Sequence, residues 1–385
     1  MIQHLFKLIW KRRKSNFLIM LEIFVAFIIL FAVSSLGTYL YRGYVKPAGI
    51  KADNVWALYV NFNTHNDSLK KQNTELLRQK IKRFQEVKTF SFTHNNVPYG
   101  FSSSNGSVNY KDRKILTQYM SVEETYPSVL GLELEEGTWF KNTDTMQKAK
   151  PTVITQSLKK ALFGNESALG KRLGNEGQDA VVVGVIGGFK FNSDFQTKDY
   201  CTFQAIGQRA DVVLLRVDPA VNADFEAQFA ESIQNLGKDW AVEILHLDDM
   251  KKDANLLFYI PIIVVGIVCG FLIANVMLGL FGVLFQNINR RRGEIGIRRA
   301  MGATGRNITS QFIGEMTVLA TFAIVVGVFF AIQFPILRVF DIESNVYLSG
   351  IFIAVMAVYG LVLVCSWFPS RQAAAIYPAM ALHEE

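Results

Sequence analysis

Four long apolar runs limit what this chain can fold into. They lie at residues 17–41, 256–285, 316–337 and 346–368. Each run is long enough to cross a bilayer, because a transmembrane helix needs about 20 consecutive apolar residues. The first run is too long for the apolar region of a cleaved signal peptide, so we expect it to remain as a span. The sequence therefore predicts an integral membrane protein with four transmembrane helices.

The basic residues predict the orientation of these spans. Lysine and arginine gather before the first run, at residues 7–14, and again in the loop between the second and third runs. Because basic loops stay on the cytoplasmic side, we expect a cytoplasmic amino terminus (1–16), a cytoplasmic loop (286–315) and a cytoplasmic carboxyl-terminal tail (369–385). The formal net charge of +7 is then a topology signal, and we expect no nucleic-acid binding.

The polar region 42–253 lies between the first two spans and contains two similar halves. Each half reads strand–helix–strand, at 55–62, 67–84 and 87–93 and again at 212–217, 220–236 and 240–247. Two such units can pair into one split βαβ sheet with both helices on one face. Residues 96–208 would form an inserted lobe richer in β structure, with strands at 151–155 and 180–186. The predicted fold class is thus an α+β membrane protein, with four transmembrane helices and one large extracytoplasmic α/β domain between helices 1 and 2.

The cytoplasmic loop carries its own helical signals. Residues 294–301 predict a short helix, with Glu294 near its positive dipole end and Gly302 as its stop. Thr304 can cap a second helix, in which Ile308, Phe312 and Met316 fall on one face. The loop is too short for an active site. We expect a helix–break–helix element that docks on a soluble partner.

The same loop resembles a known family. Residues 292–304 read Arg-Gly-Glu-Ile-Gly-Ile-Arg-Arg-Ala-Met-Gly-Ala-Thr, which resembles the cytoplasmic loop of ABC transporter permeases of the FtsX/MacB type, also called type VII. Looser similarities lie at 131–140, at 161–186 and in the tail 368–385, where His383 replaces the more usual arginine. Such proteins combine a MacB-like periplasmic core domain with an FtsX-like permease domain.

The resemblance implies a role for the loop. In that family the loop contains the coupling helix, which sits in a groove of the ATPase subunit. The residues implied in ATPase coupling are Glu294, Ile295, Gly296, Arg298, Arg299, Ala300, Gly302 and Ala303. Two ridges of small residues also favour close helix packing or dimer contact. They are formed by Gly266, Gly270 and Ala274 and by Ala323, Gly327 and Ala331.

Enzyme chemistry is not indicated. The glycines of 164–172 are one residue too far apart for a Walker A loop, and Arg172 replaces the Ser or Thr that would bind magnesium. The histidines are scattered and the three cysteines form no metal or disulfide framework. We therefore expect no enzyme, no catalytic residue, no metal and no cofactor of the chain's own. The ATPase fused to full MacB-type proteins is not found in this sequence, so ATP would be bound by a separate ATPase subunit.

The resemblance implies a permease that couples ATP hydrolysis to movement of its periplasmic domain, a mechanism called mechanotransmission. It would act as a homodimer or paired permease in the bacterial inner membrane, for efflux, export or extraction of a lipophilic or peptide substrate. An alternative is an FtsX-like signalling protein that activates a cell-wall hydrolase or sensor without transport, with a periplasmic partner protein. A third reading is a membrane-anchored sensor or scaffold with no ATPase.

Overall fold

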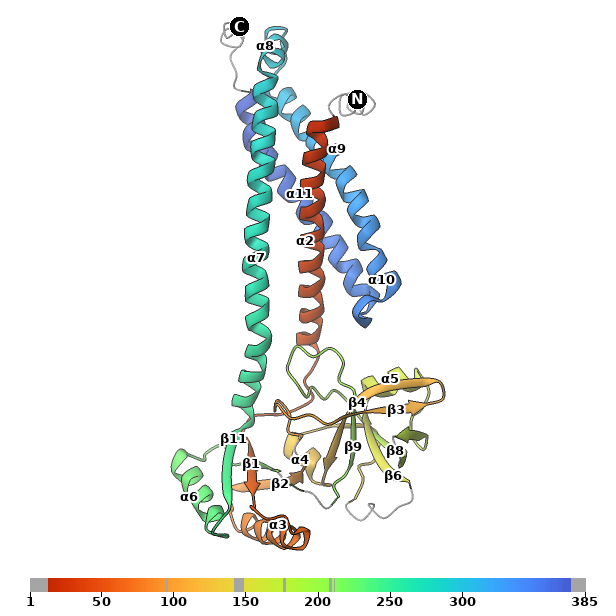
Figure 1. Ribbon diagram of the computed structural model, residues 1–385, viewed down its shortest axis with the longest axis vertical. Coiled ribbons are helices and arrows are strands. Elements are labelled where there is room, and N and C mark those ends of the chain that lie inside the picture. Colours follow the sequence, from red (N-terminus) through yellow and green to blue (C-terminus); the bar gives the residue numbers. More distant parts are fainter. Residues whose placement is uncertain are drawn as a thin grey trace. The chain divides into compact units, whose positions relative to one another are not determined.

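The computed structural model describes residues 13–94, 96–141, 149–175, 178–207, 210 and 212–374, and it divides into two units (Figure 1). The first, which we call the helical unit, comprises residues 1–41 and 260–385, and the second, the α/β domain, comprises residues 42–259. Most of the predicted tail and of the basic amino terminus therefore lies outside the described residues.

Among the residues that the structure describes, four helices are long and apolar enough to cross a membrane, as the sequence predicted. They are α2 (Arg13–Val45), α7 (Leu247–Arg290), α9 (Gly305–Ala331) and α11 (Ser344–Ala374). Its shorter elements, among the described residues, are α8 (Arg292–Ala300), α10 (Gln333–Leu337) and the 3-10 turn η2 (Val339–Asp341). Helix α7 extends beyond the predicted span 256–285 at both ends, because it continues through charged residues that no hydropathy pattern includes.

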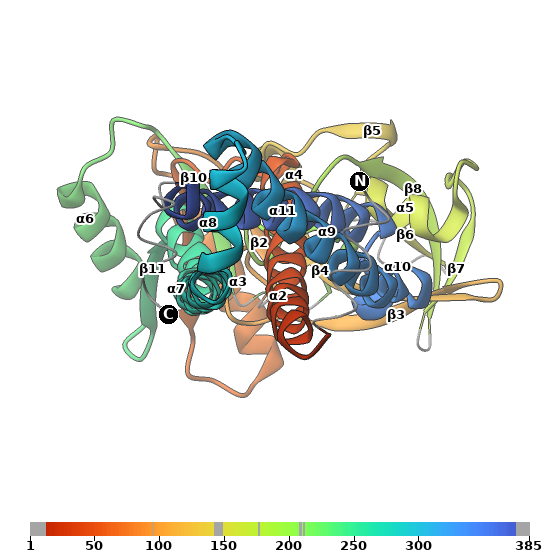
Figure 2. The ribbon, with the colours of Figure 1, turned by 90° about the horizontal axis from the view of Figure 1, so that it is seen from above.

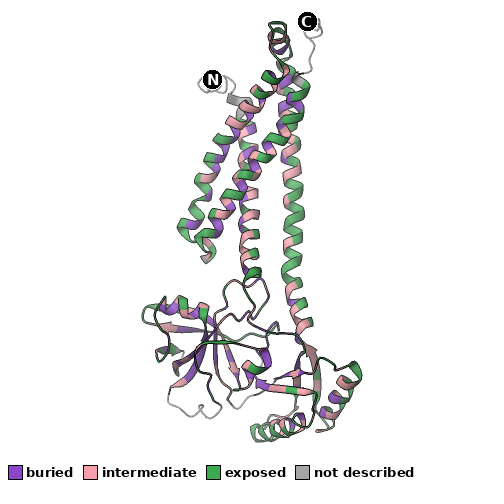
Figure 3. Cartoon of the chain, turned by 180° about the vertical axis from the view of Figure 1, so that it is seen from behind, coloured by how far each residue is buried: buried purple, intermediate pink, exposed green. Residues whose placement is uncertain are grey.

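The core of the helical unit forms around α2. Its Ile23 and Phe27 are fully buried and belong to one apolar cluster with residues of α9 and α11. Seen from above, α2 and α7 point along the view, whereas α9 and α11 lie side by side and tilt away from them (Figure 2). Of these four helices, α7 is the least covered by other parts of the chain, since no residue of its most apolar stretch is buried (Figure 3).

The predicted split βαβ arrangement of the α/β domain is confirmed. Four strands lie in the order β11-β1-β10-β2, and every neighbouring pair is antiparallel. Their bounds are β1 (Val55–Asn61), β2 (Val87–Thr93), β10 (Val212–Val217) and β11 (Ala241–His246). Helices α3 (Asp67–Ile81) and α6 (Ala223–Gln234) pack on the same face, because Leu77 and Ile81 share one core with Phe229 and Ile233.

The inserted lobe is a closed ring of strands. Hydrogen bonds join β4, β3, β7, β8, β6 and β9 in that order, and β9 pairs back with β4 in parallel. These strands are β3 (Asn105–Tyr110), β4 (Arg113–Val122), β6 (Lys150–Thr155), β7 (Arg172–Asn175), β8 (Gln178–Ile186) and β9 (Cys201–Ala205). Strand β5 (Leu134–Gly137) pairs with β8, and helices α4 (Tyr126–Leu130) and α5 (Gln156–Phe163) complete the lobe. Because the ring closes through β4 and β9, these six strands leave few unpaired edges to which another chain could add.

Candidate functional site: a helix with one locked face and one free face

The site is helix α8, the short helix between α7 and α9. It ends in a Schellman motif: the Ala303 N–H donates to the Arg298 carbonyl at 3.0 Å, and the Gly302 N–H donates to the Arg299 carbonyl at 3.1 Å. Gly302 has a φ of 95°, a conformation that glycine adopts without strain. Thr304 then caps α9, as its hydroxyl accepts from the Asn307 N–H at 3.3 Å. The stop and the cap lie where the sequence predicted them.

One face of α8 is held by apolar packing. Ile295 is 4% exposed and belongs to the apolar cluster of the helical unit, together with Ile288 and Ile308. Gly296 is buried beside it. Because the apolar side chain of Ile295 is removed from water, it contributes about 1.5–3 kcal/mol toward keeping α8 in this position.

A chain of polar contacts fixes the same face to α9. The Arg291 Nη1 lies 2.8 Å from a Glu315 carboxylate oxygen, and the other oxygen of Glu315 accepts from Gln311 at 3.1 Å. Arg298 donates to the Gln311 amide oxygen at 2.7 Å and to Glu294 at 2.6 Å. Arg291 and Glu315 are 11% and 13% exposed, so this ion pair is poorly screened by water and salt.

The opposite face of α8 is free and partly apolar. Ile297 is 51% exposed, and Met301, the cap residue that directly follows α8, is 75% exposed. These side chains project from an element otherwise rich in charge, and an i, i+4 pair lies on one helix face. Exposed apolar side chains at such spacing are what a partner's groove can bury.

The structure separates the residues implied in coupling into two groups. Glu294, Ala300 and Gly302 are exposed, and Arg298, Arg299 and Ala303 are half-buried. Ile295 and Gly296 face inward, so within this chain they support α8 and do not form its free surface. The sequence interpretation missed Ile297 and Met301. The signal that could have identified them is their i, i+4 spacing around Arg298 and Arg299.

The two small-residue ridges differ in their surroundings. On α9, Ala323, Gly327 and Ala331 are buried. A Cβ added at Gly327 would lie 2.4 Å from the Phe27 ring, so α2 and α9 approach closely there. On α7, Gly266 and Gly270 are exposed with nothing within 4 Å of an added Cβ. Together with the half-exposed Ala274 they remain a predicted contact with a second permease chain.

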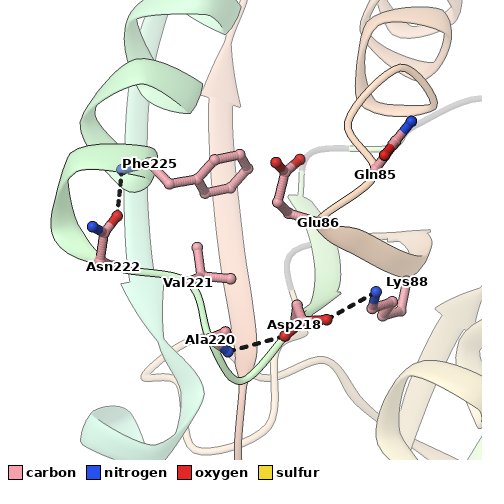
Figure 4. A pocket seen from close by; sticks show the side chains of 8 residues that line it. All are labelled: Gln85, Glu86, Lys88, Asp218, Ala220, Val221, Asn222 and Phe225. Atoms are coloured by element: carbon pink, nitrogen blue, oxygen red, sulfur yellow. Dashed lines mark hydrogen bonds and ion pairs between the residues drawn. The ribbon is translucent and has the colours of Figure 1, made fainter.

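A hollow of about 400 Å³ lies on the α/β domain between the α3–β2 and β10–α6 connections (Figure 4). Its wall includes Asp218, whose pKa is lowered because its carboxylate accepts from the Ala220 N–H and pairs with Lys88. The Lys88 ammonium lies 2.9 Å from the carboxylate. Since these opposite charges satisfy each other, we assign no catalytic chemistry to this hollow.

Within the described part of the chain, one group of possible metal ligands occurs at the start of α7. Ligand atoms of His246, Asp248 and Asp249 lie within 4.8 Å of one another. His246 is already hydrogen-bonded to Glu226 at 2.9 Å, and Asp249 pairs with Lys252 at 2.7 Å. Acidic residues in a first helical turn are also favoured by the helix dipole, so we assign no metal to this group.

Comparisons with known proteins cover both units. The family model described as "MacB-like periplasmic core domain" matches residues 16–233, and the model described as "FtsX-like permease C-terminal" matches residues 266–378. The macrolide export ATP-binding/permease protein MacB of Bradyrhizobium diazoefficiens is 26% identical over 307 residues, which cover 74% of this chain and 46% of that protein. The uncharacterized ABC transporter permease YknZ of Bacillus subtilis is 22% identical over 247 residues, 59% of each chain. The chain thus spans about half the length of the MacB relatives.

Solved structures of two such proteins are also similar to this chain. The periplasmic region of MacB from Actinobacillus actinomycetemcomitans aligns with a TM-score of 0.38 at 20% identity, covering 55% of this chain and 97% of that one. The extracellular domain of YknZ from Gram-positive bacteria aligns with a TM-score of 0.36 at 15% identity, covering 49% and 100%. With both family models matched in chain order and four apolar helices in place, the chain belongs to the FtsX/MacB-type ABC transporter permeases.

Proposed function

We propose that this permease transmits the motion of an ATP-hydrolysing subunit to its α/β domain. Helix α8 would occupy a groove of the ATPase on the cytoplasmic side, and closure of the paired ATPases would displace α8. The observation that carries the proposal is the asymmetry of α8. Its inner face is held by Ile295 and the Arg291–Glu315 pair, while Ile297 and Met301 are free on its outer face. A force applied to the outer face is then passed to α7 and α9.

Helix α7 supplies the connection from this element to the α/β domain. It runs for 44 residues from Leu247 to Arg290, and α8 begins two residues after it ends. At 1.5 Å per residue its length is about 66 Å, which exceeds the hydrocarbon thickness of a bilayer. A continuous helix is suited to rigid-body transmission, because its backbone hydrogen bonds resist local bending. Pro261 marks the place where such bending is easiest.

The assembly we propose has two permease chains, identical or paired, with a separate ATPase subunit that binds the ATP. The exposed ridge of Gly266 and Gly270 supports contact between two α7 helices. The basic loop around α8 supports placing it, and both chain termini, on the cytoplasmic side of an inner membrane. Because curated MacB relatives bear the name of macrolide export, we propose a lipophilic or peptide substrate that is moved on the outer side.

The experiment substitutes the two free apolar side chains. Met301→Asp and Ile297→Asp place a charge where a partner's apolar surface would lie, without disturbing the packed face. Burying a side chain of this size contributes about 1.5–3 kcal/mol, so each change should weaken ATPase binding by about 10- to 150-fold. The measurement is the affinity of the purified permease for the ATPase subunit that co-purifies with it. Phe101→Asp is the matched control, since Phe101 is 92% exposed in the α/β domain and should leave binding unchanged.

If all three variants bind the ATPase subunit as tightly as the unchanged chain does, the docking role of α8 is contradicted.

A second measurement separates transport from signalling. ATPase activity of the assembled complex that rises with a small amphiphile supports export, whereas a rise with a periplasmic cell-wall hydrolase supports signalling.

A further inference from the structure

Lys190 is a buried lysine in the α/β domain with no role in the site described above. Its side chain is 2% exposed. Burial lowers the pKa of this ammonium, while the nearby carboxylates of Asp194 and Asp199 oppose that effect. A buried ammonium is costly unless its donors are paired.

The three donors of Lys190 are all used on backbone carbonyls. The ammonium donates to Gly43 at 2.7 Å, to Lys46 at 2.5 Å and to Asp194 at 2.8 Å. Gly43 lies in the last turn of α2 and Lys46 directly follows that helix, within the α/β domain. Lysine has three donors and no acceptor, so this set of oxygens satisfies it completely. Lys190 therefore ties its own loop to the end of the first membrane helix.

The other end of the same loop is tied to α7. The backbone N–H of Asp194 donates to the Asn255 side chain at 3.0 Å, and the Asn255 amide donates back to the Asp194 carboxylate at 3.0 Å. Lys251 lies 3.2 Å from that carboxylate. Both Lys251 and Asn255 belong to the first turns of α7 within the α/β domain. We call residues 187–199 the bridging loop, because it contacts the domain ends of both helices.

Steric fit reinforces these polar contacts. A Cβ added at Gly43 would lie 2.2 Å from the Phe195 carbonyl oxygen, so a larger residue there would displace the bridging loop. The Phe195 ring lies between aromatic side chains of the two helices. Its centroid is 5.6 Å from Tyr44, 6.0 Å from Phe258 and 5.1 Å from Tyr259. The bridging loop is thus held by aromatic packing as well as by hydrogen bonds, and both kinds of contact involve the end of α2 and the start of α7.

We propose that Lys190 is a positioning residue for force transmission, because it locks the domain ends of α2 and α7 together through the bridging loop. This inference deepens the proposed function and rests on it for its consequence, though its geometry stands alone. Displacement of α7 can move the α/β domain only if the start of α7 is held firmly to the rest of that domain. With the lock in place, displacement of α7 moves the α/β domain as one body. Without it, α7 can tilt about its junction with β11, so less of its displacement reaches the rest of the domain.

The test begins with the lock itself, in the permease alone. Spin labels at Val45→Cys and Leu256→Cys report the spacing of the two helix ends, since these positions are 60% and 51% exposed and lie within the α/β domain. We expect one narrow distance distribution in the otherwise unchanged chain. Lys190→Met keeps the side-chain length but removes the donors, and should broaden the distribution. Lys160→Met, at an exposed lysine of α5, is the matched control and should not.

The second measurement is coupling in the complex with its ATPase. Lys190→Met should bind the ATPase and hydrolyse ATP at the basal rate but lose stimulation by substrate or periplasmic partner. If Lys190→Met does not fold, Asn255→Ala provides the same test from the half-buried α7 side, as it removes only the two bonds to Asp194. An unchanged distance distribution in both variants would show that Lys190 and Asn255 do not hold the ends of α2 and α7 together. Failure of the unmodified chain to bind any ATPase would overturn the proposed function while leaving the distance result valid.

Discussion

The ion pair between Arg291 and Glu315 gives the most quantitative prediction about the inner face of α8. The Arg291 Nη1 and the Glu315 Oε2 are 2.8 Å apart, and the two side chains are 11% and 13% exposed. The Arg291 guanidinium also lies 5.6 Å from the centre of the Phe312 ring. Removing one member of a buried pair leaves the other charge without compensation, which costs about 3–5 kcal/mol. We therefore expect Arg291→Met alone, and Glu315→Leu alone, to destabilise the helical unit by about that amount.

The double variant should behave differently from the sum of the singles. With Arg291→Met and Glu315→Leu together, no charge remains buried, and apolar replacements of similar volume are often close to neutral. Gln311 loses its bond to Glu315, which adds about 1 kcal/mol. The two singles then sum to about 6–10 kcal/mol against about 1 kcal/mol for the double variant, so the expected coupling free energy of the cycle is about 5–9 kcal/mol in magnitude.

The assay is reversible unfolding of the detergent-solubilised chain, followed by helical signal, for the four members of the cycle. The Lys252–Asp249 pair serves as the control cycle, because its side chains are 69% and 62% exposed and such pairs contribute about 0–1 kcal/mol. The Arg291–Glu315 pair does not hold α8 in place if the Arg291 and Glu315 single variants lose no more stability than the control singles, or if their effects simply add.

Three further predictions concern other parts of the chain. Gly327→Leu should destabilise the helical unit by about 1–3 kcal/mol in thermal unfolding, because the new side chain overlaps Phe27; a stability equal to that of the unchanged chain would show that α2 and α9 do not pack there. Gly266→Leu should leave the stability of the single chain unchanged and weaken association of two permease chains, measured by fluorescence transfer between differently labelled chains. Asp218→Asn should make the α/β domain less sensitive to acid. Because the pKa of Asp218 is lowered in the folded state, its ionised carboxylate stabilises the fold at pH values above the unfolded pKa of about 3.9. This stabilisation is lost as the pH falls through the folded-state pKa. Melting temperatures at falling pH test this, and parallel curves for variant and unchanged chain would refute the role of the Lys88 pair.

Much of the fold followed from local patterns. Strands β2 and β10 have the bounds that alternation and β-branched residues predicted, at 87–93 and 212–217. The pairing of the two halves could be predicted because strand–helix–strand units have few ways to bury both helices on one sheet face. The stop at Gly302 and the cap at Thr304 are also local, since each depends on the backbone and side chain of one residue.

Other features depend on contacts between distant residues. The ring of the inserted lobe closes through β4 and β9, which pair in parallel although Gln118 and Cys201 are far apart in sequence. Nothing in either strand specifies that partner. The burial of Ile295 and the exposure of Ile297 on α8 likewise depend on how α8 leans on α9 through Arg291 and Glu315. Residues only two positions apart therefore differ sharply in exposure, and of the two only Ile295 was named from the sequence.

The central claim is that the free face of α8 contacts an ATP-hydrolysing subunit. It is tested most directly by a photo-crosslinking amino acid placed at Met301 in the assembled complex in its membrane, with the same group at Phe101 as the control. We expect irradiation to join position 301 to a protein that carries an ABC ATPase domain, and position 101 to give no such product. A position 301 that crosslinks only to lipid, or that yields the same products as position 101, would contradict it.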